Sequence, residues 1–175
     1  MCIRDRLGYS PDEYNKPLKK RLPSIVIPYP GASYYITRPI NEKKYDKPLT
    51  REAGPEPLYN AAALYSGAGA VFVVESQLCA LSIKQEGGAA VALGNSGMSR
   101  LLQQLKNRPT GAALIICLDN DEPGRKASAK MAAALEGAGI FFLQANIAGE
   151  YKDPNERLQH DAAGLRQAIS AAIME

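Results

Sequence analysis

The segment Asp119-Asn120-Asp121 carries the residue types in this chain best suited to chemistry. In an extended chain, residues i and i+2 point to the same side, so both carboxylates would project together. Carboxylate oxygens are hard ligands that suit Mg²⁺, and two ions about 3.5–4 Å apart can stabilise the attacking and leaving oxygens of phosphoryl transfer. Glu75, which follows the apolar run at residues 71–74, could complete the group. These acids therefore predict a divalent metal site.

Helix capping is a simpler explanation for part of this segment. Asp121 or Glu122 could cap a helix that begins at Pro123. A single cap does not require three acids in four consecutive positions, however. The first turn of this helix also carries Arg125 and Lys126, and the helix dipole disfavours positive charge there. Cations at these positions would suit a nearby carboxylate cluster or a bound triphosphate.

Two further segments are compatible with a site but have ordinary structural explanations. The segment KDPNE at residues 152–156 has Asp at the N-cap, Pro at N1 and Glu at N3, which makes a good helix start. The segment GNSG at residues 94–97 opens a predicted helix whose N-terminus could face an anion. It lacks the Gly-Lys-Ser/Thr of a P-loop and the spacing of a nucleophile elbow.

Apolar runs alternate with helical segments after Gly69, which implies a parallel sheet covered on both faces. In such sheets, sites form outside the carboxyl ends of the strands, at a topological switch point. Glu75 and Asp119 directly follow the first and third predicted strands, so these strands must be neighbours and the predicted order is 2-1-3-4. The predicted strands span 71–74, 89–93, 114–118 and 140–143, and the predicted helices span 77–86, 98–107, 123–136, 154–159 and 165–174.

The part of the chain before residue 67 has a different composition, with frequent prolines and short runs of residues typical of β-strands. Runs at 24–27 and 33–38 flank Pro30-Gly31, which suits a type II turn and predicts a hairpin. Residues 43–57 are expected to form a loop and residues 58–65 a short helix. We therefore expect a small β-containing basic subdomain over 7–66 and an α/β domain over 67–175, while residues 1–6 (MCIRDR) resemble a non-native adapter-like remnant.

Composition and charge limit the class of protein. The chain is 46% hydrophobic and 22% charged, which is typical of a folded globular protein. No apolar run approaches the roughly 20 residues of a membrane span, and the start lacks a secretory signal pattern, so a soluble cytoplasmic protein is expected. One histidine and three separated cysteines leave too few Cys and His ligands for a tetrahedral zinc site. Residues 1–60 contain eleven Lys/Arg against seven Asp/Glu, which predicts either a solvated basic face or a nucleic-acid contact surface.

Taken in order, three segments resemble motifs of the Toprim domain shared by primases, topoisomerases and related nucleases: VFVVE at 71–75, LDNDEPGR at 118–125 and KDPNE at 152–156. The resemblance covers residues 70–158 and implies a Toprim-like α/β fold with a four-stranded parallel sheet flanked by helices. It implies Mg²⁺ or Mn²⁺ as cofactor, with two ions expected. The implied catalytic residues are Glu75, Asp119 and Asp121, and the implied metal ligands are these three and Asp153. Apart from the resemblance, the residues expected to bind phosphate are Arg125, Lys126, Lys152 and Gly94.

Upstream, residues 43–60 look like the lead-in of bacterial and phage (DnaG-type) primases, whose basic subdomain guides single-stranded template. The resemblance implies template-directed synthesis of short RNA primers from nucleoside triphosphates during DNA replication of a phage, plasmid or mobile element, with a replicative helicase in trans or fused. The expected template-binding residues are Arg38, Lys43, Lys44 and Lys47. One alternative is a Toprim-type nuclease, which uses a similar acidic site for hydrolysis. The other is a non-catalytic nucleic-acid-binding module, which is suggested by Cys79: primases usually carry Gly and Asp where this chain has Ser76 and Cys79.

Overall fold

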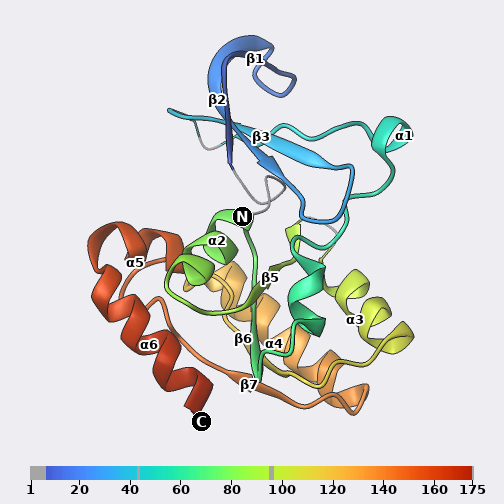
Figure 1. Ribbon diagram of the computed structural model, residues 1–175, viewed down its shortest axis with the longest axis vertical. Coiled ribbons are helices and arrows are strands. Elements are labelled where there is room, and N and C mark those ends of the chain that lie inside the picture. The colour runs from blue at the N-terminus through green and yellow to red at the C-terminus, as the bar shows by residue number, and fades with distance from the viewer. Residues whose placement is uncertain (1–6, 43, 95–96, 175) are drawn as a thin grey trace. The chain divides into compact units, whose positions relative to one another are not determined.

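The structure is a computed structural model that describes residues 7–42, 44–94 and 97–174 (Figure 1). The adapter-like segment 1–6 lies outside the described residues. The chain divides after Pro57 into two compact units. Each unit has its own sheet, and each is described separately below.

The second unit is built on a four-stranded parallel sheet with the order β5-β4-β6-β7. This order confirms the predicted order 2-1-3-4. Val73 of the central strand β4 lies opposite Val91 of β5 and Ile116 of β6, so the chain leaves β4 and β6 at the same edge of the sheet. The strands are β4 (Ala70–Val74), β5 (Ala90–Ala92), β6 (Ala113–Ile116) and β7 (Phe142–Gln144).

Helices cover both faces of this sheet, as the alternating pattern predicted. Helices α2, α5 and α6 pack on one another on one side, and α3 and α4 lie on the other (Figure 1). All five residues of β4 are buried, because side chains of a central strand meet a helix layer on each face. No helix among the described residues has the length and apolar character needed to cross a bilayer. The helices are α2 (Gln77–Gln85), α3 (Gly97–Asn107), α4 (Glu122–Gly137), α5 (Pro154–His160) and α6 (Ala162–Met174).

The prediction of a short helix over 58–65 is wrong for residues 58–60. Tyr59 pairs with Ala92 of β5 in an isolated β-bridge, and Asn60 has a positive φ of 56°. A short 3-10 helix, η2 (Ala61–Tyr65), follows and buries Leu64 in the core. Residues 58–66 therefore belong to the second unit, whereas the sequence predicts the boundary between residues 66 and 67.

The first unit contains a three-stranded antiparallel sheet with the order β1-β2-β3. The predicted hairpin is confirmed: Ala32 N–H donates to Tyr29 O at 3.1 Å, and Gly31 has the positive φ of 76° that a type II turn needs. Strand β1 was not predicted, because its Gly, Pro, Asp and Asn residues are depleted in strands. The elements are β1 (Gly8–Asn15), β2 (Lys20–Pro28), β3 (Tyr35–Pro39) and the one-turn helix α1 (Thr50–Ala53), which lies in the predicted loop.

Candidate active site

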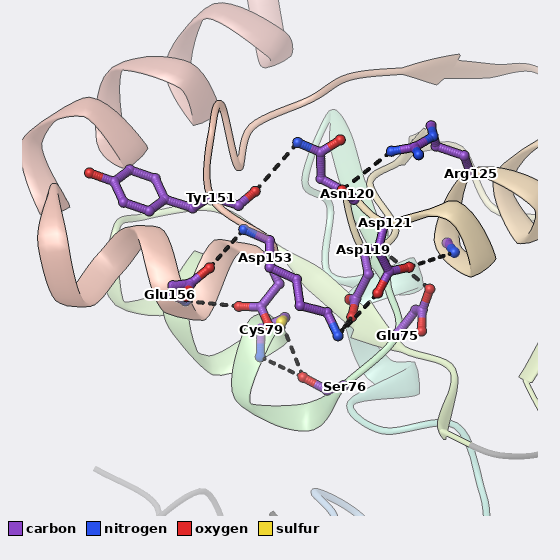
Figure 2. A network of polar contacts seen from close by, with 12 residues as sticks. Glu75, Ser76, Cys79, Asp119, Asn120, Asp121, Arg125, Tyr151, Asp153 and Glu156 are labelled. Atoms are coloured by element: carbon purple, nitrogen blue, oxygen red, sulfur yellow. Dashed lines mark hydrogen bonds and ion pairs between the residues drawn. The ribbon is translucent and has the colours of Figure 1, made fainter.

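Glu75 and Asp119 come together at the carboxyl edge of the parallel sheet (Figure 2). Glu75 directly follows β4, and the backbone N–H of Asp119 donates to Glu75 Oε1 at 3.4 Å. Strand β6 ends at Ile116 rather than at the predicted Leu118, so Asp119 lies at the start of the loop beyond the strand. The structure thus brings the first predicted acid to the second across 44 residues of sequence.

Asp121 caps helix α4 and faces a cation at the same time. Its Oδ1 accepts the backbone N–H of Gly124 at 2.9 Å, which confirms the capping interpretation. Its Oδ2 lies 3.1 Å from the ammonium of Lys152. The hydrogen bond from Gly124 and the nearby Lys152 charge hold the pKa of Asp121 below its usual value. Capping uses one oxygen, so the second oxygen is available to a cation.

The ammonium of Lys152 lies between two of the predicted metal ligands. Its Nζ is 3.4 Å from Asp119 Oδ2 and 3.1 Å from Asp121 Oδ2. This pairing raises the pKa of Lys152. The two aspartates therefore already bind one positive charge, and the position between them is suited to a cation.

Asn120, whose function the sequence analysis did not recognise, positions Lys152 beside the aspartates. Its backbone N–H donates to Lys152 O at 2.7 Å, and its side-chain Nδ2 donates to Gly149 O at 3.0 Å and Tyr151 O at 3.4 Å. The sequence did contain a signal for this. In an extended chain, neighbouring side chains alternate between the two sides, so Asn120 must point away from the side that Asp119 and Asp121 share.

A second group of possible ligands forms on the other side of Asp119. One ligand atom each of Cys79, Asp119 and Asp153 lies within 4.8 Å of the other two. Asp153 is the N-cap of α5, with Oδ1 accepting the Glu156 backbone N–H at 2.8 Å, as its sequence context predicted. Ser76 is the N-cap of α2, and its Oγ donates to Cys79 Sγ at 3.1 Å. The N-terminal turns of α2 and α5 therefore deliver a thiol and a carboxylate to Asp119.

Crowding of acids changes their proton affinity. Burial raises the pKa of Glu75 above its usual value, and the negative charge of Asp119 adds to this effect. Burial also raises the pKa of Asp119, with a further contribution from Asp153 that Lys152 partly offsets. Burial and the charge of Asp153 raise the pKa of the Cys79 thiol to about 12. The group as a whole favours bound protons or bound cations.

Replacing Glu75 with glutamine is expected to stabilise the metal-free protein at neutral pH. A carboxyl whose pKa is raised by folding stabilises the protein only while it is protonated, so its contribution is lost as pH rises through the folded-state pKa. Glutamine keeps the acceptor for the Asp119 N–H without the charge. The gain should be up to about 1 kcal/mol, because solvent screens a half-buried group. It should vanish at pH values below the ordinary glutamate range. Urea unfolding in EDTA at several pH values would measure this gain in stability. If Glu75→Gln were no more stable than the parent at pH 7, the raised pKa of Glu75 would be contradicted.

Not all predicted phosphate-binding residues lie free at this site. Arg125 is exposed, and its Nη1 donates weakly to Asn120 O at 3.4 Å. Lys126 pairs with Glu122 at 2.6 Å on the surface of α4. The N–H of Gly94 donates to Glu75 O at 3.0 Å, so this amide is already used. Arg125 is therefore the least engaged of the four, whereas Lys152 lies at the site but pairs with Asp119 and Asp121.

The predicted template-binding residues belong to the first unit. The Lys47 ammonium lies 2.6 Å from Oε2 of the buried Glu56, so it is engaged within the unit. Arg38 lies over the ring of Tyr45 at 5.7 Å, and Lys44 is exposed. Lys43 lies outside the described residues.

Comparison with known proteins identifies the domain that carries the acids. The family model described as Toprim-like matches residues 72–158, which include Glu75, the Asp119 segment and Asp153. Residues 72–158 are a Toprim-like domain. Toprim-like domains are generally metal-dependent, in agreement with the acidic group at the sheet edge. No curated protein matches the sequence.

Solved structures of primases share the fold. The Aquifex aeolicus primase (zinc-binding and RNA polymerase domains) matches with 25% identity and a TM-score of 0.65 over 85% of this chain and 40% of that one. A DNA primase domain from Pseudomonas aeruginosa matches with 19% identity and a TM-score of 0.65 over 97% of this chain and 65% of that one. The primase fragment of the bacteriophage T7 primase-helicase protein matches with 18% identity and a TM-score of 0.57 over 85% of this chain and 63% of that one. The chain therefore spans only part of each of these proteins.

Proposed function

We propose that this chain is the catalytic part of a DNA primase, which synthesises short RNA primers by metal-dependent, template-directed nucleotidyl transfer. The observation that carries the proposal is the meeting of Glu75 with Asp119 at one edge of a Toprim-like sheet, with Asp121, Lys152 and Asp153 beside them. Carboxylates at that position suit the divalent ions that stabilise phosphoryl transfer.

The donor chemistry of the site fits Mg²⁺ or Mn²⁺. Both ions prefer oxygen ligands, and four acidic residues lie at this edge of the sheet: Glu75, Asp119, Asp121 and Asp153. These residues would hold the metal, with two ions proposed. When bound, the ions would supply positive charge that stabilises the phosphate oxygens and the leaving pyrophosphate.

The remaining steps fall to side chains of the chain itself. Glu75, whose pKa is raised by burial, is suited to accept the proton of an attacking hydroxyl, because a stronger base accepts a proton more readily. Lys152, whose ammonium lies beside both aspartates, would bind the phosphates of a triphosphate held at this site. Arg125 lies exposed at the start of α4 and could contact the same phosphates.

The extent of the structural likeness favours a primase over a Toprim-type nuclease. The second unit, from Leu58 onward, makes up about two thirds of the chain. The structural likeness to the Pseudomonas primase domain covers 97% of the whole chain. The first unit thus also has a counterpart in that primase domain. We propose that this unit contacts single-stranded template through basic residues that include Arg38, Lys43 and Lys44. A replicative helicase, in trans or fused, is the proposed partner, as the T7 match suggests.

Extension of a supplied primer tests the proposal without depending on initiation by other domains. The purified chain would be incubated with a short RNA annealed to a longer DNA template, nucleoside triphosphates, and Mg²⁺ or Mn²⁺. Template-dependent lengthening of the RNA that EDTA abolishes is the expected result. Cleavage of labelled single- or double-stranded DNA without extension would favour the nuclease. Neither activity, together with no binding of Mg²⁺ or Mn²⁺ in calorimetry, would favour a non-catalytic module.

A further inference from the structure

The Cys79 thiol lies inside the acidic site rather than in an apolar part of the core. Its side chain is buried, with 1% of the residue exposed. Its sulfur lies within 4.8 Å of a carboxylate oxygen of both Asp119 and Asp153. Figure 2 shows Cys79 and Asp153 directed toward one another from two different helices. A thiol with two carboxylates within this distance has the composition of a mixed sulfur and oxygen metal site.

The hydrogen bonds around the sulfur suit a metal-bound thiolate. Ser76 Oγ donates to Cys79 Sγ at 3.1 Å, and the backbone of Asn155 also forms a hydrogen bond with the sulfur. Donors directed at a sulfur stabilise the thiolate, whereas the two carboxylates on the other side oppose it. A divalent cation bound between the sulfur and the carboxylates would balance all three negative charges. No ion pair within the described residues places a lysine or arginine against Asp153, whereas Lys152 already lies between Asp119 and Asp121.

We propose that Cys79 Sγ is a metal ligand, which makes the position between Cys79, Asp119 and Asp153 selective for a thiophilic divalent ion such as Zn²⁺ over Mg²⁺. Binding forms a sulfur–metal bond and releases the thiol proton to solvent. Three protein ligands leave the remaining coordination positions to water or substrate, as in open zinc sites. The inference rests on the proposed metal-dependent function for the premise that this edge of the sheet binds metal at all.

Cd²⁺ is the probe, because a cadmium–thiolate bond gives a near-ultraviolet charge-transfer absorbance that carboxylate ligands do not. All proteins would carry Cys2→Ser, so that only the two buried cysteines are present. The expected result is a saturable absorbance band in this protein, loss of the band in Cys79→Ser, and retention of the band in the matched control Cys117→Ser. Absence of the band in the folded parent, or its persistence in Cys79→Ser, would overturn the inference.

Two further variants remain informative if Cys79→Ser fails to fold. Asp153→Asn keeps a helix-capping side chain and should weaken Cd²⁺ binding about tenfold or more, since it removes an anionic ligand. Cys79→Asp makes the position all-oxygen and should lower the ratio of Cd²⁺ to Mg²⁺ affinity at least about tenfold. An unchanged ratio in Cys79→Asp contradicts a sulfur ligand.

The sulfur ligand and the proposed function fail in different ways. Primer extension with Mg²⁺ but no charge-transfer band would disprove the sulfur ligand and leave the primase proposal standing. A band that depends on Cys79 in a protein without primer extension would support the sulfur ligand and count against the primase.

Discussion

Asp119→Asn is expected to reduce metal-dependent primer extension by about 10³-fold or more. Asp119 is the acid shared by both groups of ligands: its amide donates to Glu75, its carboxylate pairs with Lys152, and it lies within 4.8 Å of the Cys79 and Asp153 ligand atoms. Asparagine has nearly the same shape as aspartate, and its backbone N–H can still donate to Glu75, but its side chain is neutral. A bound divalent ion would lose a charged ligand from the centre of the site.

The same variant should fold normally, which separates chemistry from stability. The Asp119 pKa is raised by burial and by Asp153, so removing its charge relieves repulsion and offsets the lost pairing with Lys152. The urea midpoint in EDTA should therefore stay close to that of the parent. Glu122→Gln is the matched control, since Glu122 is exposed in the same segment and pairs only with Lys126 among the described ion pairs. Primer extension by Asp119→Asn at more than a tenth of the parental rate would rule out Asp119 as a metal ligand.

Gly124→Ala is expected to be the most damaging single-methyl change at the site. A Cβ at Gly124 would lie 2.0 Å from the backbone oxygen and 2.7 Å from the backbone carbon of Asp119. Backbone atoms cannot rotate away as a flexible side chain can, so either α4 or the loop after β6 must move. Such overpacking costs about 1–3 kcal/mol or more. The movement would also displace the Gly124 N–H, which donates to Asp121 Oδ1. The carboxylates of Asp119 and Asp121 would then move from their positions.

Gly137→Ala provides a matched control on the same helix. A Cβ at Gly137 meets nothing within 4 Å, and its φ does not lie in the left-handed region. Alanine there should be neutral or stabilising by up to about 1 kcal/mol. Urea unfolding and Mg²⁺ titration would be measured for both variants. Equal stability and equal metal affinity of Gly124→Ala and the parent would show that the close packing of α4 on the Asp119 loop is not needed.

Local patterns in the sequence were sufficient to predict the sheet and the two acids that meet at its edge. Buried strands are continuous apolar runs, and helices carry caps such as Asp121 and Asp153, so each element has a short-range signature. Parallel strands share a carboxyl edge, and Glu75 and Asp119 follow neighbouring strands, so their proximity follows from the strand order. The missed strand β1 lacks this signature, because its residues are mostly poor strand formers.

The sequence by itself therefore determined the layered α/β fold and the edge at which the acids gather. Only the tertiary structure decided which groups surround Asp119: a thiol from α2, a carboxylate from the start of α5, and the ammonium of Lys152. It also showed that Lys47 is engaged with a buried Glu56. The physical reason is that caps and apolar periods are properties of neighbouring residues. The approach of α5 to α2 depends instead on how whole helices pack over the sheet, and no short stretch of sequence encodes that packing.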